Sequence, residues 1–249
     1  MILARLSKAI QQQNWFTVII EILIVMIGIF LGLQVTQWNK ESVNHAEFLQ
    51  ALNRLEAEVT RNLAIVDEES MIINASLNKA RAGMDVLISC SIEFEAVEKV
   101  NATLAVVRGT RSVEFRATEL NELTSAPMLL AQQSSVLRER LADLRYFLEL
   151  ARSIAEQFEP NTPGTWPTDT ESIAVKSSEI VKGMYFGIDY AVPRYPLVLN
   201  VSIEEACKDK KLQKWIHNWE AWQSNVVIFN KKLKQEYQAT LTLLQGRAL

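Results

Sequence analysis

Two cysteines, Cys90 and Cys207, are the residues whose type most directly suggests covalent chemistry. They form no C-x-x-C motif and have no histidine beside them, so a catalytic thiol is not expected. In an oxidising compartment they could instead form a disulfide, which would close a loop of roughly 120 residues and contribute on the order of 4–5 kcal/mol. Such a bridge requires the end of the first long helix and the start of the last to meet at one end of a bundle. Two buried free thiols are the alternative.

The sequence contains none of the common catalytic motifs. It has no G-x-S-x-G, no G-x-x-x-x-G-K-[ST], no H-E-x-x-H and no G-x-G-x-x-G, and it lacks the E-x-x-H pattern of di-iron bundles. Its two histidines, His45 and His217, are too few for a multi-ligand zinc site. The acidic run 67–69 points in several directions on a helix, which indicates a solvated face. We therefore expect no enzymatic activity, no cofactor and no metal, and the formal net charge of -3 predicts no general affinity for nucleic acid.

The most distinctive element is an apolar run near the start of the sequence. Residues 17–33 read TVIIEILIVMIGIFLGL, with Glu21 as their only ionisable side chain. The stretch 15–38 begins and ends with Trp, and as a helix it is about 36 Å long, enough for a hydrocarbon core of roughly 30 Å. A cleavable signal peptide fits less well, because the run exceeds the usual apolar region and no A-x-A-like site follows. We predict a single-pass transmembrane helix at 15–38, with a buried helix of a soluble protein as the alternative.

Several side chains of this segment are candidates for contact with a partner or with the lipid bilayer. Gly28 and Gly32 form a G-x-x-x-G motif, which permits close helix pairing, although glycine is also common in membrane helices. Glu21 lies about one turn inside the segment, where it can contact a partner, line an ion path or extend to the headgroups. The predicted transmembrane contacts are Glu21, Gly28, Gly32 and Gln34, and the predicted interfacial anchors are Trp15, Trp38 and Asn39.

The flanking cations predict the orientation. Residues 1–14 contain Arg5 and Lys8 and no acidic side chain, whereas residues 39–52 contain one lysine and two glutamates. Because an excess of Lys and Arg marks the cytoplasmic side, we predict a short cytoplasmic tail at 1–14 and an external domain at 39–249.

The remainder predicts an all-α body. With 49% hydrophobic and 22% charged residues the chain is too apolar for disorder. Apolar positions keep helical spacing beyond the membrane segment, and no proline occurs before Pro127, so one helix should run to about Ile88. Shorter helices are expected within 92–107 and 115–126, and a longer one over 128–158. The last helix, within 202–244, starts at a Ser202–Glu205 capping box and carries an a/d seam typical of coiled coils, which suits the core of a three- or four-helix bundle. The seam residues are Leu212, Trp215, Trp219, Trp222, Val226, Phe229 and Leu233.

Residues 160–201 differ in kind from the rest. They hold five of the six prolines and three of the eight glycines, and they are rich in aromatic side chains. We predict a long irregular loop, in which 173–185 could form a short helix and 195–201 is the one stretch with a strand-like pattern. Such loops are usually functional or disordered, and the aromatic content argues against disorder, so this one is the candidate binding surface. Its aromatic candidates are Trp166, Tyr185, Tyr190 and Tyr195.

The segment EILIVMIGIFLGLQVTQWNKE (21–41) resembles the opening of a bacterial family of single-pass inner-membrane proteins that is known as a domain of unknown function. The family's Gly before the Glu is Ile20 here, and Gly32 replaces an Ala. Residues 115–144 are similar to the family's middle helix pair, more loosely. The resemblance implies an inner-membrane anchor and a periplasmic helical domain, and it supplies no activity. The matching positions are Glu21, Ile22, Gly28, Leu31, Leu33, Gln34, Trp38, Asn39 and Glu41.

These observations support three hypotheses of function. The first is a non-enzymatic, membrane-anchored periplasmic module that binds a partner protein or small ligand through the loop 160–201. The second is an accessory subunit of an inner-membrane complex, or a homodimer, recognised through the transmembrane helix. A periplasmic hydrolase is the third, and it would require a pocket with a perturbed pair of carboxylates.

Overall fold

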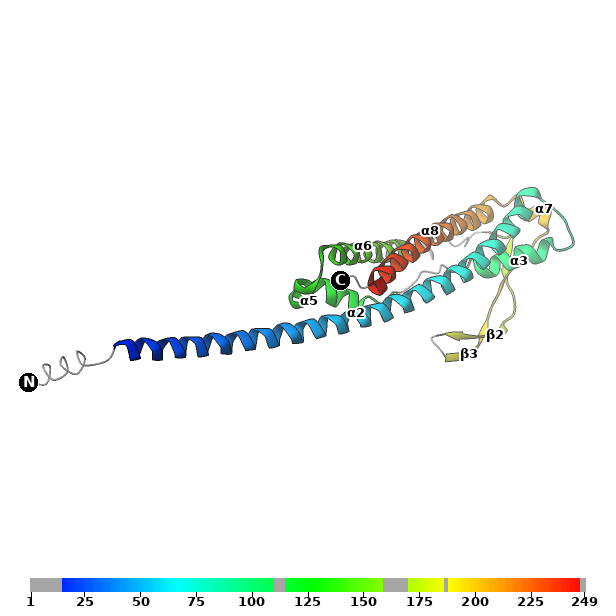
Figure 1. Ribbon diagram of the computed structural model, residues 1–249. Coiled ribbons are helices and arrows are strands. Elements are labelled where there is room, and N and C mark those ends of the chain that lie inside the picture. Colours follow the sequence, from blue (N-terminus) through cyan, green and yellow to red (C-terminus); the bar gives the residue numbers. More distant parts are fainter. Residues whose placement is uncertain (1–14, 110–114, 159–169, 186–187, 247–249) are drawn as a thin grey trace, which may run out of the picture.

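The computed structural model describes residues 15–109, 115–158, 170–185 and 188–246. These residues form a long helical rod that continues into an elongated helical body, and two small antiparallel sheets lie beside the body (Figure 1). The predicted all-α architecture with a long first helix is confirmed, apart from these short strands.

The rod is a single helix, α2 (Trp15–Ser89), of 75 residues. At a rise of about 1.5 Å per residue it is roughly 110 Å long. Its side chains from Ile19 to Val43 are exposed, whereas from Phe48 onward one face of the helix, which includes Leu52 and Leu55, is buried against other helices. The prediction that the first helix runs without a break to about Ile88 is therefore confirmed.

After α2 the chain folds back along it. Helix α3 (Ala96–Val106) packs against the last turns of α2, and the chain then forms α4 (Thr118–Ser125), α5 (Pro127–Gln132) and α6 (Ser135–Phe158). Pro127 occupies the first turn of α5, where its missing N–H is not needed.

The predicted helix over 128–158 is interrupted between α5 and α6. Gln133 has an extended backbone, and its side-chain amide donates a hydrogen bond of 2.7 Å to the carbonyl oxygen of Leu123. The hydroxyl of Ser134 then accepts from the backbone N–H of Leu137 at 3.2 Å, so it satisfies a donor in the first turn of α6.

The last helical segment also has two parts, α7 (Ile203–Ala206) and α8 (Lys210–Gly246). The predicted N-cap at Ser202 is confirmed, because the Ser202 hydroxyl accepts from the N–H of Glu205. A second cap follows, in which the Asp209 carboxylate accepts from the backbone N–H of Lys211 and Leu212 at 2.9 and 3.0 Å. This cap explains why α8 starts anew at residue 210.

Helix α8 runs antiparallel to α2 and divides the interior into two cores. The proximal core, nearer the exposed rod, joins α2, α4, α5, α6 and the second half of α8 around Leu55, Leu141 and Tyr237. The distal core joins the last part of α2, α3, α7 and the first half of α8 around Leu87 and Trp215. The predicted seam of α8 is core: five of its residues are buried, and Trp222 and Phe229 are half-buried.

The prediction of one long irregular loop at 160–201 is wrong where the structure describes it. Strands β1 (Ile173–Val175) and β4 (Leu197–Leu199) pair antiparallel, and between them β2 (Glu179–Tyr185) and β3 (Ile188–Arg194) form a hairpin. The short helix expected over 173–185 is therefore absent, whereas the strand-like pattern at 195–201 corresponds to β4. β-Branched residues favour strands here. β1 pairs with β4 across the hairpin that β2 and β3 form with each other.

A buried carboxylate links α6 to α8. Glu236 on α8 is 6% exposed and accepts from Arg140 of α6 and from Lys232 one turn earlier on its own helix. Burial alone would raise the pKa of Glu236, but the hydrogen bonds from Lys232 and Arg140 outweigh it and hold the pKa below its usual value. The charged form of Glu236 is therefore favoured by folding.

This arrangement predicts a loss of stability in acid. A carboxylate with a lowered folded-state pKa stabilises the protein above its unfolded pKa of about 4.3, and this contribution disappears as the pH falls through the lower folded value. Glu236→Gln should reduce the free energy of unfolding by about 1–3 kcal/mol at pH 7 and should flatten its decline below pH 5. Urea unfolding of the full chain in detergent at pH 7, 4 and 3 measures both effects. Glu149→Gln, in an exposed pair, is the control. If the free energy of unfolding fell equally with pH in the Glu236→Gln variant and in the unsubstituted protein, Glu236 would not be a source of the acid sensitivity.

Candidate functional site

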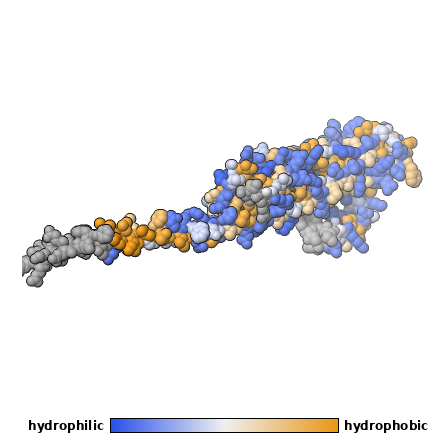
Figure 2. Space-filling view, in the orientation of Figure 1, coloured by the Kyte–Doolittle hydropathy of each residue, from blue (hydrophilic) through white to orange (hydrophobic). Residues whose placement is uncertain are grey.

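The first candidate site is the exposed part of α2. Among the described residues the structure contains one helix long and apolar enough to cross a membrane, and none of its most apolar stretch is buried. Figure 2 shows this stretch as an apolar segment of the rod outside the body. The large apolar side chains between Ile19 and Trp38 have exposed fractions from 39 to 74%. A helix buried within its own chain does not show such exposure, so this stretch is a possible membrane span.

The predicted contact residues of this segment do not all share a face. Because each residue turns the helix by about 100°, Glu21, Gly28 and Gly32 fall within roughly 20° of one direction, whereas Gln34 points about 140° away. A Cβ atom added to Gly28 or Gly32 would meet nothing within 4 Å, so this face is open. The structure thus brings three of the four candidates together.

The predicted anchors lie at the two ends of the same segment. Trp38 is 74% exposed and Asn39 follows it on the helix surface. Trp15 is the first residue of α2, and its side chain lies outside the described part of the structure. At the end of the segment, the Gln37 amide donates to Glu41 at 2.9 Å, which marks the change to a polar helix surface.

The structure contains a disulfide between Cys90 and Cys207, with their Cα atoms 5.6 Å apart. The two helix ends do meet at one end of the body, as the bridge requires, and free cysteines are absent from the described residues. Cys90 directly follows α2 and lies in the left-handed backbone region with a φ of 49°. The side chain of Gln213 reinforces the junction, because its amide donates to the carbonyl oxygens of Leu87 and Cys207 at 3.0 and 2.9 Å.

The aromatic candidates of the predicted loop do not form one surface. Tyr190 lies opposite Gly183 in the β2–β3 ladder, and its ring covers that glycine so closely that a Cβ there would lie 2.6 Å from the hydroxyl. Tyr195 is exposed and follows β3, where its carbonyl oxygen accepts from Arg108. Tyr185 ends β2, but its side chain, like all of Trp166, lies outside the described residues.

The base of the strand region is attached to the body, and the hairpin projects from it. The N–H of Leu199 in β4 donates to the Asn101 side chain on α3 at 2.7 Å. Ser172, before β1, donates to the Asp209 carboxylate at 2.7 Å. Burial raises the pKa of Asp209, but hydrogen bonds from Thr170, Ser172 and two backbone N–H groups bring it below its usual value. Figure 1 shows β2 and β3 extending away from the helices.

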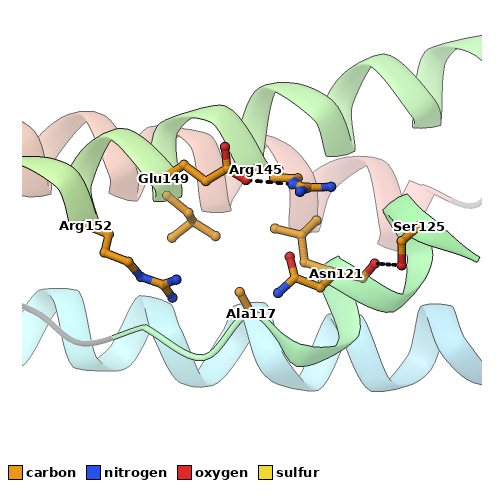
Figure 3. A pocket seen from close by; sticks show the side chains of 8 residues that line it. Ala117, Asn121, Ser125, Arg145, Glu149 and Arg152 are labelled. Atoms are coloured by element: carbon orange, nitrogen blue, oxygen red, sulfur yellow. Dashed lines mark hydrogen bonds and ion pairs between the residues drawn. The ribbon is translucent and has the colours of Figure 1, made fainter.

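A small cavity of about 280 Å³ lies between α4 and α6. Sequence reasoning missed it, although the seven-residue spacing of two arginines on α6 places them on one face. Arg145 donates to Glu149 at 2.8 Å, and Figure 3 shows the guanidinium of Arg152 directed toward Ala117. Two guanidinium groups and one carboxylate can attract a small anion, but they are not the pair of carboxylates that the hydrolase hypothesis requires. The residues that line the cavity include Leu120, Asn121, Arg145, Leu148, Glu149 and Arg152.

Comparison with known proteins adds no assignment. No protein-family model matches the chain, and neither a curated protein nor a solved structure is significantly similar to it. Within the described residues, no three His, Cys, Asp or Glu side chains are grouped so that they could hold a metal ion. The resemblance of residues 21–41 to a family of single-pass inner-membrane proteins stays a prediction.

Proposed function

We propose that this protein is a single-pass membrane-anchored interaction module whose helical body lies outside the cytoplasm, in the periplasm of a bacterium. The observation that carries the proposal is the uncovered apolar stretch of α2 between Ile19 and Trp38, because water disfavours so many exposed apolar side chains on one helix. The same helix continues without a break from the apolar stretch into the folded body.

Two further observations support the orientation. Arg5 and Lys8 precede the apolar stretch without an acidic neighbour in residues 1–14, which favours a cytoplasmic start. The Cys90–Cys207 disulfide favours an oxidising compartment for the body. A reporter fused after Leu249 tests the orientation, since a reporter active only outside the cytoplasm supports it and one active only in the cytoplasm contradicts it.

Charges placed in the middle of the apolar stretch should abolish anchoring. Ile24→Lys with Val25→Lys introduces two cations that cost about 2.5–3.5 kcal/mol each at the centre of a membrane helix. We expect the variant to move from the carbonate-resistant membrane fraction to the soluble or aggregated fraction. Ile228→Lys, at an equally exposed apolar position on α8, is the matched control and should stay in the membrane. Release of the unsubstituted protein by carbonate would contradict the anchor itself.

The open face of Glu21, Gly28 and Gly32 favours a second candidate function, that of a subunit recognised through its membrane helix. The observation behind it is that a partner helix could approach the backbone there without meeting a side chain. Replacing residues 19–35 by leucines keeps the anchor and removes this face. Retained function would favour recognition through the body, and lost function would favour recognition inside the membrane.

A further inference from the structure

We infer that the end of the body farthest from the membrane segment is a docking surface for a short segment of a partner protein that combines apolar and basic side chains. This tip surface consists of Ile88, Ile92, Phe94 and Val97, at the connection between α2 and α3. This inference rests on the proposed interaction role. It adds the place where a partner binds and the chemistry of that partner.

The tip surface concentrates exposed apolar area in ten consecutive residues. The exposed fractions are 67% for Ile88, 70% for Ile92, 104% for Phe94 and 48% for Val97. Other exposed apolar side chains of the described body, such as Val136 and Ile228, occur singly along its length. Single exposed apolar residues are ordinary on soluble surfaces, whereas a cluster marks an interaction site. Figure 2 shows apolar colouring at this end of the body.

The connection that carries these side chains is held in place. Val86, Leu87, Ala96 and Val100 are buried in the distal core, so the inward positions of the connection are already filled. The disulfide fixes its start at Cys90. Because core packing and the disulfide already hold this connection in one conformation, it loses little conformational entropy when a partner binds.

Hydrogen bonds define the rest of the turn. The N–H of Ala96 donates to the carbonyl oxygen of Glu93 at 2.9 Å, and the N–H of Lys99 donates to that of Glu95 at the same distance. The Lys99 ammonium also contacts the Glu93 carboxylate at 3.2 Å. Phe94 therefore stands on an ordered turn between two glutamates.

The charges around the tip surface specify the partner. Asp85, Glu93, Glu95 and Glu98 are exposed on this side, and Lys99 is the cation among them. Exposed lysines gather beyond the disulfide, at Lys208, Lys210 and Lys214. A segment that places apolar side chains on Ile92 and Phe94 and basic ones on the glutamates is complementary in both respects.

The protein's own bilayer is too distant to be the occupant. Fifty residues of continuous α2 separate Trp38 from Ile88, which is about 75 Å of helix. The acidic side chains also disfavour the surface of an anionic membrane. A partner protein is therefore the occupant that distance and charge support.

The test measures binding of defined peptides to the full chain in nanodiscs of zwitterionic lipid, with empty nanodiscs subtracted. One amphipathic peptide is built from leucine and lysine, and its counterpart replaces each lysine by glutamate. We expect Ile92→Ser with Phe94→Ser to weaken binding of the lysine peptide about tenfold or more. Val136→Ser with Ile228→Ser, which changes two exposed apolar residues elsewhere on the body, should change it less than about twofold. Glu93→Lys with Glu95→Lys should reverse the preference between the two peptides.

Equal effects of the tip and control variants, or equal binding of both peptides, would overturn the inference. Occupation of the tip surface by a second copy of this chain or by lipid would also overturn it. A second copy is indicated by a dimer in sedimentation that Ile92→Ser with Phe94→Ser dissolves. A lipid surface is indicated by binding of added phosphatidylglycerol vesicles that the same variant abolishes. Carbonate release of the chain would overturn the anchor alone, because the same peptide titration repeated with the full chain in detergent does not need a bilayer. Circular dichroism of each variant confirms that the helices are intact.

Discussion

Replacing Cys90 and Cys207 together by serine is expected to lower the free energy of unfolding by about 4–5 kcal/mol. The two residues are 117 positions apart, so the bridge removes much of the conformational entropy of the unfolded chain. It also joins the end of α2 to the junction of α7 and α8, where the distal core begins. Without the bridge, the first part of the body to open should be this end.

Guanidinium unfolding of the full chain in detergent, followed by tryptophan fluorescence, measures this loss. Trp215 and Trp219 are buried in the distal core and report on the end of the body that the disulfide closes. Reducing the unsubstituted protein should reproduce the effect of the serine variant, which serves as a control for the substitutions themselves. A serine variant as stable as the oxidised protein would show that the bridge contributes nothing to folding.

The second large effect is expected at Gly83, where α2 and α3 cross. A Cβ atom at this position would lie 2.0 Å from the Thr103 hydroxyl oxygen, 2.8 Å from the Thr103 Cβ and 3.0 Å from the carbonyl oxygen of Lys99. Thr103 has no room to move aside, since it is fully buried and its hydroxyl donates to the carbonyl oxygen of Lys79 at 2.8 Å. Gly83→Val should therefore separate the two helices and destabilise the protein by about 3 kcal/mol.

Hydrogen exchange locates this effect as well as measuring it. The amides of α3 should lose protection in the Gly83→Val variant, and those of α6 should not, because α6 belongs to the proximal core. Gly246→Val is the control, as an added side chain there meets nothing within 4 Å. Because α3 supports Val97, the same variant should also weaken peptide binding at the tip surface. Unchanged protection of α3 would mean that the helices accommodate the side chain.

The long helices could be predicted because their pattern is local. Apolar residues recur every three or four positions from Phe48 to Val66 and again along α8, and the structure buries most of them. Pro127 and Ser202 indicate helix starts, because proline suits the first turn of a helix and a serine hydroxyl caps its N–H groups. The disulfide was left open for the opposite reason, since it depends on where two helix ends lie that are 117 residues apart in the sequence.

The features that were missed depend on partners far away in the chain. Glu58 of α2 accepts hydrogen bonds from the backbone N–H of Glu119 and Leu120, at 3.0 and 3.2 Å, and thereby caps α4 from another helix. Asn62, one turn later, binds both the N–H and the carbonyl oxygen of Arg116. Nothing near Glu58 or Asn62 in the sequence indicates these roles.

The strands and the tip surface were missed for related reasons. Residues 179–185 include Glu, Lys and Met, which favour helices, and their strand state is fixed only by pairing with 188–194. Ile92 and Phe94 are unremarkable in sequence, because exposure is a property of the folded turn. The pattern of charged and apolar residues does not show that Leu87 and Ala96 fill the core at this turn, which leaves Ile92 and Phe94 outside it.

Under the proposed anchoring, the continuity of α2 also sets the direction in which the body faces around the membrane normal. With the apolar stretch and the body on one uninterrupted helix, each residue added or removed between positions 39 and 47 would swing every outer surface around the axis by roughly 100°. Such a change leaves all contacts inside the body intact. The length of this short polar stretch is therefore what decides which neighbours in the membrane each side of the protein faces.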